Sequence, residues 1–173
     1  YRFRGIILDH QNKDMLLFEG KAGNSYYALT RPLGSLYFQT APVSEFLPGP
    51  TINLAQSPDL LHWKPTDEPL LRPKKGNMRI NRIGGGTPPI LTTEGWLILY
   101  HAVEASGKVE IYRTYGALLD RDDPQKIVRI EDKKPLLEAK DELTMNMEDT
   151  IYLRDVVFTT GIVDAGDHYI VAS

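Results

Sequence analysis

The amino-acid sequence predicts an all-β protein that is built from a repeated unit of short strands. Its apolar runs are short, rich in β-branched and aromatic residues, and bounded by Gly, Pro, Asn and Asp, whereas helical periodicity is nearly absent. Twelve prolines and fourteen glycines among 173 residues favour many turns and few helices. Similar sequence features also return along the chain, which is typical of a repeat architecture.

The apolar runs predict ten strands, and each run is too short and too irregular in period for an amphipathic helix. In chain order the predicted strands are Gly5–Leu8, Met15–Phe18, Tyr26–Thr30, Ile52–Gln56, Pro89–Thr92, Trp96–His101, Ile111–Leu119, Ile127–Ile130, Val156–Thr159 and His168–Ala172.

Three of the predicted strand pairs form hairpins of one design. Their turns contain Asn24, Gly95 and Gly166, and each of these residues lies 71 residues from the next. Asn and Gly tolerate the positive φ angle that tight hairpin turns require. The regular spacing therefore indicates one structural unit that is repeated around hairpins centred near residues 24, 95 and 166.

A second repeat lies between the hairpins. The polar turns Ser57–Trp63 and Leu118–Pro124 are each followed by a Pro-Leu-Leu element, at Pro69–Leu71 and Pro135–Leu137. A hairpin, a third strand, a polar turn and a Pro-Leu-Leu strand together describe a four-stranded blade of a β-propeller. A β-sandwich with coincidental spacing is the alternative, and the joint return of two features favours the propeller.

Residues 1–173 are interpreted as a single partial propeller domain. The chain holds roughly two and a half to three units, whereas propellers usually have about four to eight blades. Open blades leave strand edges unpaired. We therefore expect the chain to belong to a longer protein, in preference to closing by association with other chains.

The composition excludes several classes of function. A formal net charge of −3 gives no bulk attraction to nucleic acid or to an anionic membrane. The absence of cysteine excludes a disulfide scaffold, a cysteine-based zinc site and a thiol nucleophile. No run approaches the roughly 18 apolar residues that span a bilayer, and no signal peptide is visible, so cytoplasm and periplasm both stay open. The crowded carboxylates of Asp120, Asp122 and Asp123 do not fit a calcium loop, so no metal site is expected.

The most informative segment runs from Arg82 to Glu104. Its Gly84-Gly85-Gly86 run lets the backbone approach a ligand closely. It lacks the Lys-Ser/Thr pair and the helix of a nucleotide-binding P-loop. His101 and Glu104 fall at the end of a predicted strand, where a rigid scaffold can present them. The ordinary alternatives are a structural histidine and a solvated loop carboxylate.

This segment resembles glycoside hydrolase family 130, the β-mannoside phosphorylases and β-1,2-mannosidases. That family typically shows a lysine-Ile-Gly-x-Gly-x-x-Pro-Ile run, then Gly-Trp-Leu and Tyr-His-Gly-Val. Four further blocks resemble the family in the same order: Lys13-Asp14 with Leu17–Glu19 and Thr30–Pro32, then Ser57–Trp63, then Ala117–Asp120 with Asp123-Pro124, and then Asp155–Gly161. The resemblance implies a five-bladed β-propeller, of which this chain covers roughly the middle two and a half to three blades.

The resemblance also implies roles for individual residues. Arg31 matches an arginine that contacts phosphate in the phosphorylases, and His101 matches their phosphate-side histidine. Arg82 stands where they have a phosphate-contacting lysine, and its guanidinium is larger and planar, so the fit to an anion differs. Asp155, in a matched block, and the aromatic Trp96 are candidates for contact with the sugar.

Departures from the family pattern shift weight from phosphate toward water as the attacking group. Gln56 stands near the position of a second phosphate-contacting arginine, and Ala102 replaces the usual glycine after the histidine. Attack by water needs a carboxylate as general base, for which Glu104 is the first candidate and Glu148 the second. The aspartate that serves as the family's general acid lies upstream of the matched blocks, so this chain alone lacks half of the pair that inversion requires.

The expected function is cleavage of β-mannosides with inversion, either by phosphorolysis to mannose 1-phosphate or by hydrolysis. The expected partner is a β-mannoside oligosaccharide, with inorganic phosphate as the co-substrate in the first case. No metal or organic cofactor is expected, and assembly into a homo-oligomer stays open. The alternatives are a non-catalytic sugar-binding or truncated propeller module, and a different five-bladed glycosidase family, against which the cations Arg82 and His101 argue.

Overall fold

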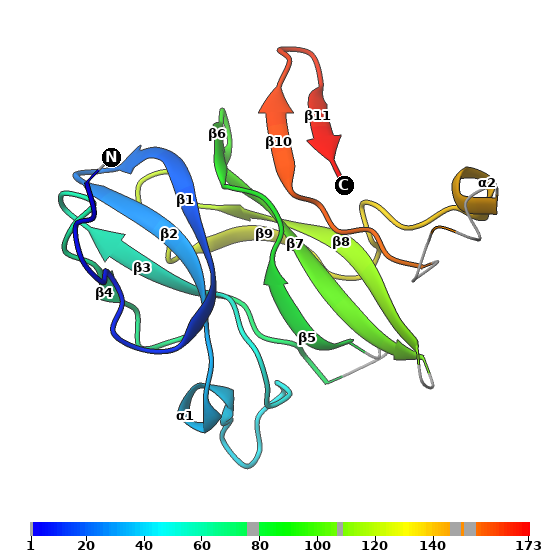
Figure 1. Ribbon diagram of the computed structural model, residues 1–173, viewed down its shortest axis with the longest axis horizontal. Coiled ribbons are helices and arrows are strands. Elements are labelled where there is room, and N and C mark those ends of the chain that lie inside the picture. Colours follow the sequence, from blue (N-terminus) through cyan, green and yellow to red (C-terminus); the bar gives the residue numbers. More distant parts are fainter. Residues whose placement is uncertain (1, 76–79, 107–108, 146–149, 151–154) are drawn as a thin grey trace.

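The strands form three antiparallel sheets that follow one another along the chain (Figure 1). The computed structural model describes residues 2–75, 80–106, 109–145, 150 and 155–173. Its two helices, α1 (Ser35–Phe38) and α2 (Asp141–Thr144), are single turns. No helix among the described residues is long and apolar enough to cross a membrane. The predicted all-β class is confirmed.

The first sheet is a four-stranded antiparallel meander that begins with a hairpin. Its turn places Gly23 at a φ of 56°, so the positive φ lies one residue before Asn24, the residue predicted to adopt it. A glycine accepts this conformation without the steric cost that a side chain would add. In spatial order the strands are β1 (Asn12–Ala22), β2 (Ser25–Pro32), β3 (Asn53–Ser57) and β4 (Lys64–Pro65).

The second sheet is the largest, and its first strand is interrupted. The glycine-rich run and the prolines that follow it separate β5 from β6, and both of these strands pair with β7. Gly95 opens β7 at a φ of 137°, where a Cβ atom would lie 2.1 Å from the Leu119 carbonyl oxygen, so only glycine fits. The strands are β5 (Ile80–Gly85), β6 (Ile90–Thr92), β7 (Gly95–Ser106), β8 (Val109–Leu119) and β9 (Ile127–Glu131).

The third sheet is a hairpin of β10 (Gly161–Asp164) and β11 (Tyr169–Ala172). Its turn contains Gly166 at a φ of 95°. The three hairpins of the chain therefore each contain one glycine in the left-handed region, at or next to the residue that the repeat singled out.

The two Pro-Leu-Leu elements make the same contact in successive sheets. In Pro69–Leu71 both leucine N–H groups donate to the Ile52 carbonyl, at 2.8 and 3.0 Å. In Pro135–Leu137 both leucine N–H groups donate to the Thr114 carbonyl, at 2.7 and 3.3 Å. Because two successive donors share one carbonyl, each element forms an isolated bridge instead of the predicted strand. The fourth strands of the two sheets are β4 and β9 instead.

Two further predicted strands are wrong. Residues Gly5–Leu8 pair with no strand, and the side chain of Ile6 is 84% exposed. Of Val156–Thr159 only Val156 pairs, in a parallel bridge with Tyr112. The strand β5 was not predicted, because its glycines and polar residues have a low β propensity. The segment is a strand because it pairs with β7.

The hydrophobic core lies between the first and second sheets. Trp96 is 1% exposed, and its indole N–H donates to the Arg121 carbonyl at 2.9 Å. Its ring packs edge-on against Phe18 of β1, with 5.0 Å between ring centroids. The core thus fixes one face of β7 against the neighbouring sheet.

Candidate functional site

The second sheet presents two faces with different chemistry. In β7 successive side chains point to opposite faces, and residues that pair directly on neighbouring strands share a face. His101 pairs with Gly84 on β5 and Thr114 on β8, and Val103 pairs with Arg82 and Tyr112. We call this side, which also carries Glu110, the His101 face. The opposite side, which we call the Glu104 face, carries Glu104, Arg113 and Tyr115.

Arg31 and His101 converge from two different sheets above Gly84. Arg31 lies on β2 and is 7% exposed, while His101 lies on β7 and is 2% exposed. A Cβ atom on Gly84 would lie 2.7 Å from His101 Nε2 and 3.1 Å from Arg31 Nη1. The missing side chain of Gly84 therefore makes the room in which the imidazole and the guanidinium meet.

Both of these buried side chains keep unused hydrogen-bonding atoms. Within the described residues, Arg31 Nε and His101 Nδ1 have no hydrogen-bond partner. Asp14 Oδ2 lies 3.5 Å from Arg31 Nη1, and Asn12 Oδ1 accepts a bond from the Arg31 backbone N–H at 2.9 Å. Buried polar atoms without partners are rare and costly in proteins. This cluster can therefore supply donors to a polar or anionic ligand.

The imidazole of His101 is neutral at physiological pH. Burial lowers its pKa to about 4, and the positive charge of Arg31 adds to this shift. Interaction with the Gly85 backbone opposes the shift, and the charges of Lys13 and Arg82 contribute less. His101 consequently offers one N–H donor, while the positive charge of the cluster resides on arginine.

Arg82 points into the same face but is already paired. Its Nη2 atom forms an ion pair with Glu110 Oε2. The Tyr112 hydroxyl donates to Glu110 Oε2 at 3.2 Å and accepts from Arg82 Nη2 at 3.4 Å. The Arg82 and Glu110 side chains are 34% and 45% exposed, so this pair lies at the solvent-facing margin of the cluster.

An aromatic side chain from the far end of the chain covers His101. The Phe158 ring lies 4.5 Å from the imidazole, centroid to centroid, and 6.2 Å from the Tyr112 ring. Phe158 remains 42% exposed. Thr159 lies against Gly86, where a Cβ atom would approach its Oγ1 atom to 2.4 Å. An exposed aromatic face beside polar donors is the usual composition of a small-molecule site.

Glu104, the first candidate base, lies on the opposite face. It is three residues beyond His101 on an unbroken strand, and it accepts a hydrogen bond from the Tyr115 hydroxyl at 3.4 Å. A carboxylate on this side of the sheet does not reach water held beside Arg31 and His101. We therefore do not assign the base role to Glu104.

Asp155 takes part in an ion network on the Glu104 face. Arg113, whose side chain is 14% exposed, binds both of its carboxylate oxygens, with 2.9 Å between Nη2 and Oδ2. Arg113 Nε also lies 3.5 Å from Glu138. The hydrogen bond to Asp155 raises the pKa of Arg113 despite its burial. Asp155 thus fastens its segment to β8, and both of its oxygens are occupied.

Two other residues named from the sequence, Trp96 and Gln56, lie away from the cluster. Trp96 is buried in the core and has no exposed face to offer to a sugar ring. Gln56 donates to Ser25 Oγ at 2.8 Å, and its partner on β2 is four residues, roughly 13 Å, from Arg31. Glu148 lies outside the described residues.

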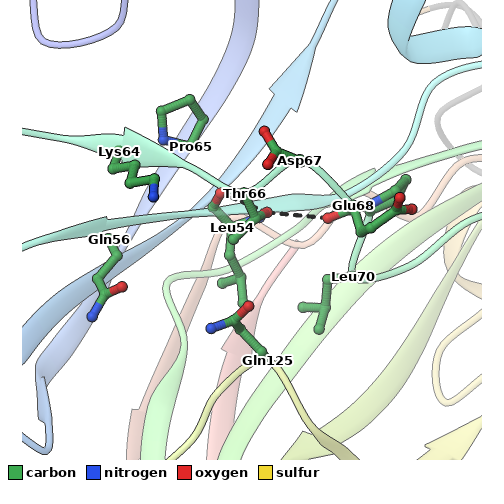
Figure 2. Close-up of a pocket in the computed structure, with 10 residues that line it drawn as sticks. Leu54, Gln56, Lys64, Pro65, Thr66, Asp67, Glu68, Leu70 and Gln125 are labelled. Carbon is green, nitrogen blue, oxygen red and sulfur yellow. Dashed lines mark hydrogen bonds between the residues drawn. The ribbon is translucent and has the colours of Figure 1, made fainter.

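Two cavities lie elsewhere on the chain. One of about 370 Å³ lies beside β3 and β4 (Figure 2), with Lys64, Asp67 and Gln125 on its wall. Its Thr66 hydroxyl is already bonded to the Leu54 and Glu68 backbones. The other, of about 700 Å³, is lined by Leu71 and by residues of the second sheet that include Ile83 and Tyr100. Neither is lined by Arg31 or His101, so the donor chemistry, not cavity size, identifies the site.

The described residues contain no group of three or more His, Asp or Glu side chains that could hold a metal ion. Asp120 instead accepts the backbone N–H groups of Asp122 and Asp123, at 3.0 and 2.9 Å. Asp59 accepts those of Leu61 and His62 in the same way in the first sheet. The crowded carboxylates are therefore the turn that the repeat predicted.

Asp14, Glu110 and Phe158 were not identified from the sequence as members of the cluster. Strand alternation was an available signal, because it puts His101 and Glu104 on opposite faces of any regular strand. No local signal brings Phe158 to His101, because this contact joins residues that are far apart in the sequence.

Comparison with known proteins identifies the group to which these residues belong. A family profile described as beta-1,4-mannooligosaccharide phosphorylase matches residues 35–173. A 1,2-beta-oligomannan phosphorylase of Thermoanaerobacter sp. is 33% identical over 158 residues, which are 91% of this chain and 45% of that protein. A beta-1,2-mannobiose phosphorylase of Listeria innocua is 36% identical over 169 residues, 95% of this chain and 41% of that protein.

Solved structures show the same similarity. The Listeria innocua beta-1,2-mannobiose phosphorylase, solved with beta-1,2-mannobiose, superposes with a TM-score of 0.72 at 35% identity, over 97% of this chain and 42% of that one. A glycosyl hydrolase from Bacteroides ovatus, at 20% identity and a TM-score of 0.64, shares the fold over 91% of this chain and 43% of its own. The five-bladed propeller family is thereby confirmed as the fold class. The chain spans less than half the length of these relatives.

Proposed function

Because the chain belongs to glycoside hydrolase family 130, we propose that it supplies the phosphate-side wall of an active site that cleaves β-mannosides by phosphorolysis. The convergence of Arg31 and His101 above Gly84, with an unpartnered buried nitrogen on each side chain, supports this proposal most strongly. The names of two relatives with 33% and 36% identity favour β-1,2-linked mannosides as the substrate. The proposal concerns the whole protein, since the chain spans less than half the length of these relatives.

In the proposed reaction, Arg31 neutralises phosphate and neutral His101 donates one N–H to it. A phosphate oxygen attacks the anomeric carbon from the face opposite the leaving sugar. The new C–O–P bond forms as the glycosidic C–O bond breaks, and the departing oxygen takes a proton from a general acid. The product is mannose 1-phosphate with inverted configuration. Preorganised donors in a buried site stabilise the charge of the attacking group.

The same geometry argues against hydrolysis through the carboxylate named from the sequence. Attack by water needs a general base within hydrogen-bond reach of that water. Glu104 lies on the far face of the sheet, and Asp155 is held by Arg113. Neither of these two carboxylates supports hydrolysis, and the names of the two relatives favour phosphorolysis.

The test is to incubate the full-length protein with β-1,2-mannobiose, with and without inorganic phosphate, and to separate the products. Mannose 1-phosphate that forms only when phosphate is present supports the proposal. Free mannose produced at the same rate in both incubations overturns it and identifies a hydrolase.

A further inference from the structure

Each arginine of the His101 face already carries a carboxylate partner. Arg31 Nη1 lies 3.5 Å from Asp14, and Arg82 is paired with Glu110. His101 is neutral because burial holds its pKa at about 4. The two ion pairs therefore carry no net charge, and the cation that remains near His101 is Lys13. A phosphate dianion that entered this arrangement unchanged would meet two carboxylates, each already paired with an arginine.

The two carboxylates differ in how readily they can break their ion pairs and turn toward solvent. Asp14 has a short side chain that is 27% exposed, and its Oδ2 atom is buried. Glu110 is 45% exposed, has one more rotatable bond and is the second residue of β8. Rotation of Glu110 into solvent keeps its charge hydrated, whereas release of Asp14 would strand a buried acceptor.

We propose that Glu110 is an internal counter-anion, which occupies Arg82 in the free protein and withdraws when phosphate binds. This inference rests on the proposed anion site. The pair is held by the Tyr112 hydroxyl, which contacts both Glu110 and Arg82. When Glu110 withdraws, the Arg82 guanidinium and the Tyr112 hydroxyl become available together. Glu110 thus lowers the affinity for phosphate and leaves the sugar contacts unchanged.

The expected size of this effect follows from the exposure of the pair. Ion pairs that are partly exposed to solvent contribute little, because water and salt screen them. Removal of the competing charge should therefore strengthen phosphate binding by roughly two- to fivefold. The gain should shrink as salt concentration rises, since the Arg82–Glu110 attraction is screened.

The experiment compares the full-length protein with its Glu110→Gln variant, in which the side chain keeps its shape and loses its charge. We expect the KM for phosphate to fall two- to fivefold, roughly, while the KM for β-1,2-mannobiose stays constant. Glu94→Gln is the matched control, because Glu94 also pairs with an arginine, Arg129, at 2.9 Å, but lies at the opposite end of β7. It should leave both constants unchanged.

Calorimetric titration with inorganic phosphate alone separates this inference from the proposed function. Tighter phosphate binding by Glu110→Gln than by the unmodified protein supports the counter-anion, even if neither protein cleaves mannobiose. Equal binding, weaker binding by the variant, or no phosphate binding by either protein overturns it. Failure of phosphorolysis alone would instead count against the proposed function.

Discussion

The two faces of the second sheet are made by the same strands and contain the same kinds of side chain, yet they differ in how their charges are satisfied. On the Glu104 face, Arg113 binds Asp155 through two nitrogens and approaches Glu138 with the third. On the His101 face, Arg31 and His101 are almost completely buried and keep unpartnered nitrogens. An ion network whose nitrogens all have partners stabilises the packing of the strands. Buried nitrogens without partners can instead bind a ligand.

Of the substitutions on either face, replacement of Arg31 should have the largest effect on phosphorolysis. Its replacement by methionine removes the buried positive charge and should lower kcat/KM for phosphorolysis by roughly a hundredfold or more, as the loss of a preorganised charged donor does. Arg31→Lys should recover part of this loss, because it restores charge without the planar fork. Steady-state kinetics with varied phosphate provides the measurement, and a loss below threefold would show that Arg31 does not hold the anion.

Burial of His101 should make the free energy of unfolding depend on pH. The pKa of His101 is lowered to about 4 in the folded chain, whereas an unfolded histidine titrates near 6.5. Below about pH 6.5 the unfolded chain takes up a proton that the folded chain refuses, so the free energy of unfolding falls until about pH 4. The loss is on the order of 3 kcal/mol at most.

Denaturant titrations of the unmodified protein and of His101→Gln between pH 7 and pH 4 measure this loss by difference. The variant should lose less stability than the unmodified protein over that interval. If the two proteins lose the same amount, His101 is not the neutral, buried group that the site requires.

A substitution on the Glu104 face should change the stability of the protein and leave phosphate binding unchanged. Arg113→Met removes both bonds to Asp155, which keeps 38% of its side chain exposed and can be partly hydrated. We expect the free energy of unfolding to fall by about 1–2 kcal/mol, between the values for exposed and buried pairs. The KM for phosphate should stay within twofold of its original value, and a tenfold increase would contradict the division between the two faces.

The repeat and the two buried groups above Gly84, Arg31 and His101, could be predicted from the sequence. Glycine turns near residues 24, 95 and 166 and the repeated Pro-Leu-Leu elements correspond to equivalent contacts in successive sheets. Arg31 and His101 were identified by resemblance, and the structure brings them together. Motif matching predicts such residues well because each lies within a short, recognisable run.

Pairing between distant strands could not be predicted in the same way. The partner of Arg82 is Glu110 on β8, and the aromatic cover of His101 is Phe158, and neither belongs to a local pattern. Glu104 was favoured because it lies close to His101 in sequence, although strand alternation separates the two side chains. Trp96 was a candidate for contact with the sugar, and only the packing of two sheets shows that it is buried.

The most direct test of the anion site is the KM for phosphate of the Gly84→Ala variant. The added methyl group would lie 2.7 Å from His101 Nε2 and 3.1 Å from Arg31 Nη1, so it must push the two donors apart. Gly161→Ala is the control, because its added Cβ atom would meet only the Ala172 methyl group at 3.9 Å. We predict a rise of roughly tenfold or more for Gly84→Ala and none for Gly161→Ala, as expected when preorganised donors are displaced. An unchanged KM for phosphate in a folded Gly84→Ala protein would contradict the assignment of the His101 face as the phosphate site.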